Sequence, residues 1–124
     1  MAIGETVFDP SAGPRLSVEL DFPPAPAPVR ILLAGELDSE EVNRLLTAVA
    51  HLPLDGDGRD VRVEASELTF VDSAGIRALL TFRERASESG VRVVIGRVTP
   101  NVYRVMDIAG LVDVFEIRDP AGSG

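Results

Sequence analysis

The feature that most constrains the fold is a repeated change of hydrophobic period along the chain. Residues 16–22 (LSVELDF) alternate apolar with polar side chains, as a half-buried strand does. Residues 42–49 instead carry apolar side chains at helical spacing, and residues 61–68 return to a strand pattern. Strands that alternate with helices predict an α/β layer fold, in which right-handed crossovers join mostly parallel strands.

The whole chain reads in the order β-β-α-β-α-β-α-β, which predicts a mixed, mostly parallel sheet of four to five strands with about three helices. We expect the first two strands to pair antiparallel and the valine-rich fourth strand to be central. Helix boundaries follow from capping signals, including Gly90 and Gly110 as C-terminal stops. The predicted strands are 16–22, 29–37, 61–68, 91–96 and 114–117, and the predicted helices start at Asp38 (with Glu41 as capping-box partner), Ser73 and Thr99-Pro100.

Length and composition place the chain among ordinary globular domains. The chain has 124 residues, enough for one domain, and 45% of them are hydrophobic, which argues against disorder. We expect a flexible N-terminal tail over 1–15, one domain over 16–118 and a C-terminal tail over 119–124. Residues 23–28 (PPAPAP) predict a stiff turn between two strands, with a proline-rich ligand for an SH3-type domain as the alternative.

Charge and composition also exclude several classes of function. The net charge is −8, which disfavours binding to nucleic acid or to an anionic membrane and suits a basic protein partner. The chain has no cysteine, so it has no disulfide, thiol nucleophile or thiolate metal site. It has neither a run of about 18 apolar residues nor a secretory signal, so we expect a cytoplasmic protein with no membrane partner.

Two apparent metal sites are incomplete. In residues 55–60 (DGDGRD), Asp55 and Asp57 fit the first and third positions of a calcium loop, but Arg59 and Ser66 occupy positions that need oxygen donors. His51 is the only histidine, and no ligand cluster accompanies it. We therefore expect a turn at 55–60, a helix-end histidine at His51, and neither metal nor cofactor.

The stretch TFVDSAGIRALLTF (69–82) raises a question of chemistry, because Ser73 stands where a strand gives way to a helix. It is not a hydrolase nucleophile elbow, since Val71 occupies the position of the first glycine. No glycine-rich phosphate loop with its lysine is present, so we expect no enzymatic activity and no ATP site.

Two compatible interpretations of Ser73 remain open. As an N-cap, its hydroxyl would satisfy a free helix amide. As a phosphorylation site, it would place about −1.5 to −2 charges at a helix N-terminus, where a phosphate is tolerated. If the neighbouring strands end on one sheet edge, Asp38 and Asp72 form an acidic rim around Ser73, and a phosphate there would alter a partner surface.

Three blocks resemble the STAS domain of bacterial anti-sigma factor antagonists: AGELD (34–38), ELTFVDSAGIRALL (67–80) and TPNVYRVMDIAGLVDVFEI (99–117). The likeness covers about residues 16–118. It implies that the unphosphorylated protein binds an anti-sigma factor, a GHKL-type serine kinase, and so releases a sigma factor. Phosphorylation of Ser73 would then switch binding off, and a PP2C-type phosphatase would reset it. The implied partner-binding residues are Asp38, Asp72, Ser73, Ala74, Gly75 and Ile76, with Gly75 allowing close approach of a partner.

The chain departs from the common pattern of this family at a few positions. Ala74 stands where Ser or Thr is usual, Ile76 replaces Leu, and Glu64 replaces Asp. None of these changes removes the acceptor hydroxyl. STAS domains also serve as stressosome scaffolds and as small subunits of lipid-transport ABC systems, so a scaffold or subunit that does not switch is the alternative function.

Overall fold

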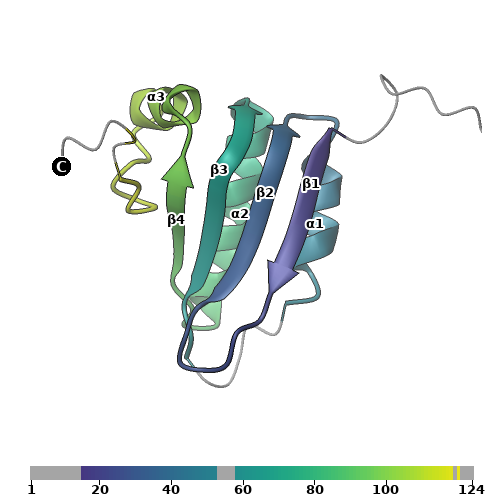
Figure 1. Cartoon of the computed structure of the whole chain (residues 1–124), viewed down its shortest axis with the longest axis vertical. Coiled ribbons are helices and arrows are strands. Elements are labelled where there is room, and N and C mark those ends of the chain that lie inside the picture. Colours follow the sequence, from purple (N-terminus) through teal and green to yellow (C-terminus); the bar gives the residue numbers. More distant parts are fainter. Residues whose placement is uncertain (1–14, 53–57, 119, 121–124) are drawn as a thin grey trace, which may run out of the picture.

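The computed structural model describes residues 15–52, 58–118 and 120 (Figure 1). Within them the elements follow the order β-β-α-β-α-β-α. The elements are β1 (Leu16–Asp21), β2 (Val29–Leu37), α1 (Val42–Val49), β3 (Val61–Val71), α2 (Ser73–Glu88), β4 (Val93–Val98) and α3 (Pro100–Ile108).

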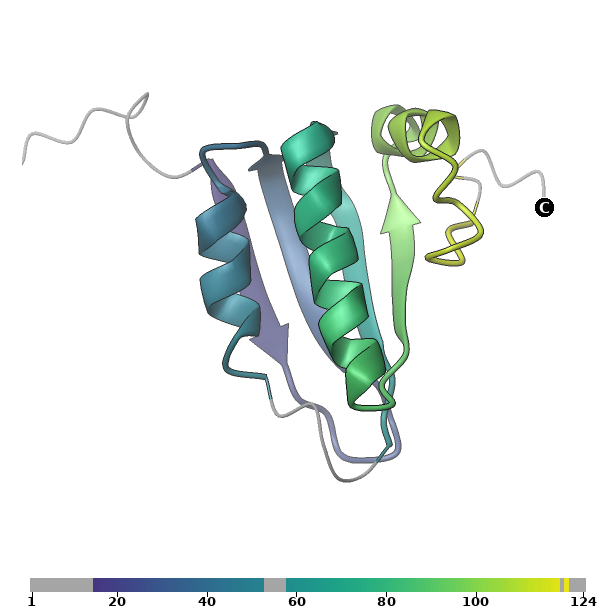
Figure 2. The same cartoon turned by 180° about the vertical axis from the view of Figure 1, so that it is seen from behind.

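The four strands form one sheet in the order β1-β2-β3-β4. β1 runs antiparallel to β2, while the β2–β3 and β3–β4 pairs are parallel, which confirms the predicted mixed, mostly parallel sheet. Helices α1 and α2 lie side by side on one face of the sheet, and α3 lies across the end at which β3 and β4 finish (Figure 2). None of the helices in the described residues covers the opposite face, which is turned toward the viewer in Figure 1.

The core lies between the sheet and the two helices. Every second residue of β2 from Val29 to Leu33 is buried, and so are Val61 and Val63 of β3, as the alternation predicts. Helix α1 buries Leu45 and Val49 of its apolar stripe. Burial of a large aliphatic side chain contributes about 1.5–3 kcal/mol. The largest fully buried side chains are Phe115, Ile31, Leu33, Leu37, Leu45, Leu68, Met106, Val61, Val63 and Val102.

The sequence prediction was wrong about the last strand and about the position of β4. Residues 112–116 form turns, and Glu116 has a φ of 56°, which an extended strand does not allow. The N–H of Ile95 nevertheless donates to the carbonyl of Phe115 (2.9 Å). β4 is the last strand in the sheet order, so it is an edge strand and not a central one. It is nevertheless largely buried, because the turn segment around Phe115 packs along its outer side.

An ion pair holds the same turn segment against the start of β4. Nε and Nη2 of Arg92 donate to the two oxygens of the Glu116 carboxylate, at 2.9 and 2.7 Å. This hydrogen bonding, together with the charges of Glu116 and Asp60, raises the pKa of the exposed Arg92 side chain. Glu116, the residue with the left-handed backbone, therefore ties the segment to the sheet together with the carbonyl of Phe115.

β3 extends beyond the end of its neighbour β4, and residues at the start of α3 form hydrogen bonds with this extension. Pairing between β3 and β4 ends at Ala65 and Val98, so the carbonyls farther along β3 have no β4 partner. The Thr99 hydroxyl donates to the carbonyl of Leu68 (3.1 Å), and the Asn101 amide donates to the carbonyl of Thr69 (3.2 Å). Thr99 also caps α3 by accepting from the N–H of Val102, as predicted.

The proline-rich segment is the turn that its sequence predicted. The N–H of Ala27 donates to the carbonyl of Pro24 (3.2 Å), and the segment joins antiparallel strands β1 and β2. Arg59 donates to the carbonyl of Pro23 (2.6 Å), which anchors the turn to the start of β3. Most of the two predicted tails and both aspartates of the apparent calcium loop (Asp55 and Asp57) lie outside the described residues, which leave out 1–14, 53–57, 119 and 121–124.

Candidate partner-binding site at the start of helix α2

Two neighbouring strands deliver the candidate residues to one edge of the sheet. Leu37 at the end of β2 pairs with Val71 at the end of β3, in parallel. The N–H of Asp72 then donates to the carbonyl of Leu37 (3.3 Å). Asp38 and Asp72 therefore follow adjacent strand ends, which is the arrangement that the sequence analysis required for a shared rim around Ser73.

Asp72, not Ser73, caps α2, so the prediction of Ser73 as N-cap was wrong. Asp72 has extended backbone angles (φ −110°, ψ −174°), and its Oδ1 accepts from the N–H of Gly75 (2.9 Å). Ser73 is the first helical residue, and its side chain is exposed. An aspartate directly after a strand reaches the third helical N–H as well as a serine does. The Ser73 hydroxyl is thereby left out of the capping.

Gly75 is buried and allows α2 to approach β2 closely. A Cβ at this position would lie 2.5 Å from the Leu37 carbonyl oxygen and 2.8 Å from Cγ2 of Val71. Any larger residue would have to push the helix away from the strand ends. The close approach that the family resemblance assigned to a partner is therefore made here within the chain itself.

The predicted capping box at Asp38 and Glu41 is not formed. Helix α1 begins at Val42, and its N-cap residue Glu41 makes no side-chain capping hydrogen bond. Asp38 instead accepts from the N–H of Glu40 (3.0 Å), while its own carbonyl accepts from the N–H of Glu41 (2.9 Å). An aspartate that bonds the backbone two residues ahead stabilises a turn, so Asp38 shapes the loop between β2 and α1.

Arg15 is part of this rim, although no sequence pattern predicted it there. Its guanidinium lies 2.7 Å from Oδ2 of Asp38, 3.0 Å from Oε1 of Glu40 and 3.6 Å from Oε1 of Glu36. The residue was assigned to the tail because it precedes the first apolar residue of β1. Its carbonyl in fact accepts from the N–H of Glu36 (2.9 Å), which extends the antiparallel pairing by one residue. The rim therefore contains a cation that partly neutralises its carboxylates.

The other predicted surface residues surround Ser73 with different exposures. Asp72 and Ala74 are half-buried, and Ile76 is half-buried with its side chain packed on the core. Ser73 is the exposed member of this group. A hydroxyl in that position is open to a second protein, and the half-buried residues Asp72 and Ala74 lie next to it in the chain.

The remaining predictions concern metals and membranes. His51 is exposed and lies just beyond the end of α1. Among the described residues, no group of three or more His, Cys, Asp or Glu side chains is placed to hold a metal ion. None of the described helices combines the length and the apolar character that crossing a bilayer requires.

Comparison with known proteins identifies the family. The sequence profile described as "Mlab, STAS domain" matches residues 20–117. The chain belongs to the STAS domain family. The anti-sigma-B factor antagonist of Listeria monocytogenes is 26% identical over 98 residues, which cover 76% of this chain and 82% of that protein.

Two solved structures of proteins named SpoIIAA share the fold of this STAS domain. The anti-sigma factor antagonist SpoIIAA in its unphosphorylated form superposes with a TM-score of 0.68 at 22% identity, over 83% of this chain and 87% of that one. The Bacillus cell fate determinant SpoIIAA in the phosphorylated form gives a TM-score of 0.62 at 21% identity, over 83% and 90% of the two chains. Likeness at this level of identity establishes the fold.

Proposed function

We propose that this STAS domain is an anti-sigma factor antagonist, and that phosphorylation of Ser73 switches its binding off. The observation that carries the proposal is the exposed Ser73 hydroxyl on the first residue of α2, next to a capping aspartate. The antagonist names of the relatives support the same role. The partner would be an anti-sigma factor of the GHKL serine kinase type, and the protein would act in the cytoplasm by binding, without catalysis.

The geometry of α2 makes Ser73 a suitable acceptor for a phosphate. A helix N-terminus carries partial positive charge, so a phosphate on its first residue is favoured and does not unwind the helix. The 16 residues of α2 are held at their start by the Asp72 cap and the Gly75 contact with Leu37. Modification would therefore change the charge and bulk of the surface with little change in the fold.

The proposed contact surface consists of Asp38, Asp72, Ser73, Ala74 and Ile76, with Gly75 as the buried residue that sets the helix position. The small Ala74 side chain and the half-buried Ile76 let a partner backbone lie close to the helix start. A phosphate on Ser73 would occupy that space and add about two negative charges beside Asp72. Both effects oppose a docked kinase, and a PP2C-type phosphatase would restore the free hydroxyl.

The decisive experiment measures binding of the full chain to each GHKL-type anti-sigma kinase of the source organism. We expect tight binding by wild type and Ser73→Ala, and binding at least about tenfold weaker by Ser73→Glu, because a buried unpaired charge costs more than 1.4 kcal/mol. Incubation with ATP should release wild type from its kinase but not Ser73→Ala. Ser87→Glu, an exposed serine near the far end of α2, is the matched control and should bind as wild type does.

The alternative is a STAS subunit that holds an assembly together without switching, as the sequence analysis allowed. It predicts that no kinase phosphorylates Ser73 and that Ser73→Ala and Ser73→Glu bind their partner equally. Intact-mass measurement after incubation with kinase and ATP separates the two functions, since a single added phosphate that Ser73→Ala abolishes occurs only in the switch.

A further inference from the structure

Among the described residues, no strand pairs with the outer edge of β1. In the described part of the chain β1 is the first strand of the sheet, with β2 as its one neighbour. The carbonyl of Arg15 accepts from the N–H of Glu36, so the backbone groups of Arg15 face β2 and those of the next residue face outward. By this alternation Leu16, Val18 and Leu20 present their N–H and C=O groups to the outside. Such an edge accepts a further strand.

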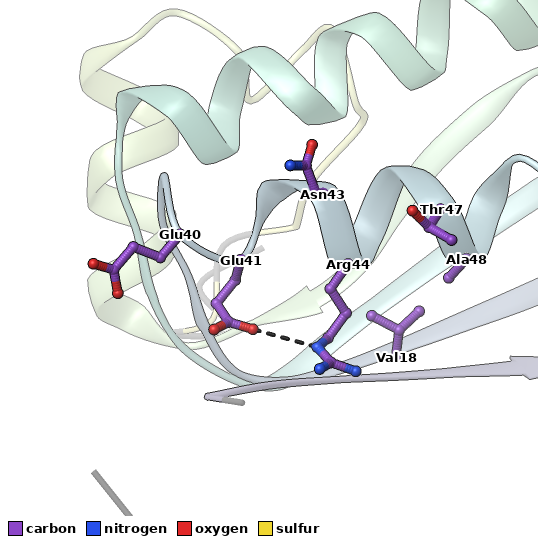
Figure 3. Close-up of a pocket in the computed structure, with 7 residues that line it drawn as sticks. All are labelled: Val18, Glu40, Glu41, Asn43, Arg44, Thr47 and Ala48. Carbon is purple, nitrogen blue, oxygen red and sulfur yellow. Dashed lines mark ion pairs between the residues drawn. The ribbon is translucent and has the colours of Figure 1, made fainter. Parts of the chain in front are cut away.

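A groove runs between this edge and helix α1 (Figure 3). It has a volume of about 540 Å³. Val18 of β1 lies on one side, and Arg44 and Ala48 of α1 lie on the other. A second hollow of about 540 Å³ adjoins it at Val18 and Arg44 and continues to Arg15. An added strand, about 4.8 Å from β1, would send every second side chain into this groove.

The charges around the edge favour a basic occupant. On the face of the sheet away from the helices, β1 exposes Ser17, Glu19 and Asp21. Asp21 pairs with Arg30 (3.2 Å), whereas the Glu19 carboxylate makes no ion pair with another described residue. At the end of the groove, the Glu40 side chain is 80% exposed and pairs with Arg15 (3.0 Å), so the unpaired carboxylate of the edge is Glu19 among the described residues. A second copy of this chain, with its net charge of −8, is repelled from such an edge.

We propose that the outer edge of β1 and the groove beside α1 bind a basic, extended segment of a protein partner that alternates apolar and basic residues. The segment adds to the sheet as a further strand. Its apolar side chains enter the groove over Val18 and Ala48, and its Lys or Arg side chains lie beside Glu19 on the opposite face. β1 is two strands away from β3, which leads into Ser73, and the second hollow reaches the rim at Arg15, which pairs with Asp38. The edge therefore provides a second contact beside the proposed switch surface.

The first test is a titration of the ¹⁵N-labelled full chain with the acetylated, amidated peptide Lys-Val-Lys-Val-Lys-Val-Lys, followed by NMR. We expect the largest shifts, and new protection from hydrogen exchange, at the amides of Leu16, Val18 and Leu20. Two control peptides should bind at least about tenfold more weakly. An isomer with its valines contiguous lacks the alternation of apolar and basic side chains, and the peptide Glu-Val-Glu-Val-Glu-Val-Glu lacks the positive charge.

Variants on the edge supply the second test. Glu19→Lys should weaken binding of the alternating peptide about fivefold, because it places like charges across the strand pair. Glu84→Lys changes the net charge equally on the exposed face of α2 and should weaken binding less than about twofold. Val18→Pro removes an outward N–H and leaves the β1–β2 ladder intact, so it should weaken binding about tenfold.

Several results would overturn the proposal. Equal binding of the two isomeric lysine peptides, or equal effects of Glu19→Lys and Glu84→Lys, would mean general charge attraction without strand addition. A concentration-dependent doubling of mass that Val18→Pro abolishes would assign the edge to a second copy of the chain. Circular dichroism checks that Val18→Pro folds, and if it does not, the two lysine substitutions decide.

Discussion

The Asp72 carboxylate accepts a hydrogen bond of 2.9 Å from the backbone N–H of Gly75, and this contact sets the first turn of α2. Ser73 lies between these two residues, inside the helix, with its side chain exposed. Helix capping and the hydroxyl that we propose as phosphate acceptor thus belong to different residues. Stability and switching should therefore respond to different mutations.

Replacement of Asp72 tests the cap. Asp72→Ala should lower the free energy of unfolding by about 1 kcal/mol, because the Gly75 N–H loses its acceptor. Asp72→Asn keeps a side-chain oxygen in place and should cost less than about 0.5 kcal/mol. Urea denaturation measures both variants, and an equal loss in the two would contradict the capping role.

Replacement of Ser73 tests the separation of stability from switching. Ser73→Ala should change the free energy of unfolding by less than about 0.5 kcal/mol, as an exposed substitution does. If Ser73 were the N-cap, the same change would cost about 1 kcal/mol. Ser73→Glu should stabilise by about 0.3–1 kcal/mol at low salt, because an acidic side chain in the first turn favours the helix dipole. Thermal unfolding at two salt concentrations checks both expectations.

Gly75→Ala tests the close contact between α2 and β2. The new Cβ would collide with the Leu37 carbonyl, which is backbone and cannot rotate away, so we expect a loss of about 1–3 kcal/mol. Arg77→Ala, an exposed position two residues along, also creates an alanine and should change stability by less than about 0.5 kcal/mol. Similar stabilities for the two variants in urea would show that the helix adjusts without strain.

Arg15→Ala tests the cation of the rim. It leaves the Asp38, Glu36 and Glu40 carboxylates without their shared partner, so the free energy of unfolding should fall by about 1 kcal/mol. The loss should shrink in about 0.5 M salt, which screens the remaining repulsion. Arg104→Ala, at an exposed position of α3, is the control for loss of one positive charge. If the two substitutions lower the free energy of unfolding equally, the ion pairs of Arg15 contribute no more to stability than any other surface charge.

Thr99→Ala tests the attachment of α3 to β3. The change removes both the N-cap of α3 and the hydrogen bond to the Leu68 carbonyl, so we expect a loss of about 1–2 kcal/mol. Thr99→Ser retains the hydroxyl and should keep most of the stability. Hydrogen exchange should show faster exchange of the α3 amides in Thr99→Ala. Unchanged protection of those amides would mean that packing of Val102 and Met106 alone holds the helix.

The alternation of strand and helix patterns was sufficient to predict the layer fold, because burial on one face imposes its period on the residues of each element. The order of the strands in the sheet is not a local property. The valines of 91–96 predicted a buried strand, and β4 is buried, but the cover on its outer side comes from the turn around Phe115. Local pattern also could not reveal the left-handed backbone at Glu116, where an apolar run resembles a strand.

The N-cap of α2 is Asp72, one residue before the serine that the sequence offered as a cap. Aspartate and serine are equally good N-caps, and the choice between Asp72 and Ser73 depends on where β3 stops, which the pattern did not set. Arg15 was missed because its partners are more than 20 residues away in sequence, at Asp38 and Glu40. Ion pairs at such separations have no local signature, although the position of Arg15 next to β1 made it a neighbour of the β2 end.

The placement of Ser73 one residue inside the helix has a consequence for how this domain can change over generations. A residue that neither caps nor packs is free to drift, so Ser, Thr, Ala or Glu at this position should all be compatible with the same fold. Duplicated copies of the gene could then lose or regain the proposed regulation through a change of this one codon. The fold would survive each step because Asp72 caps α2 and Gly75 sets the contact of α2 with β2.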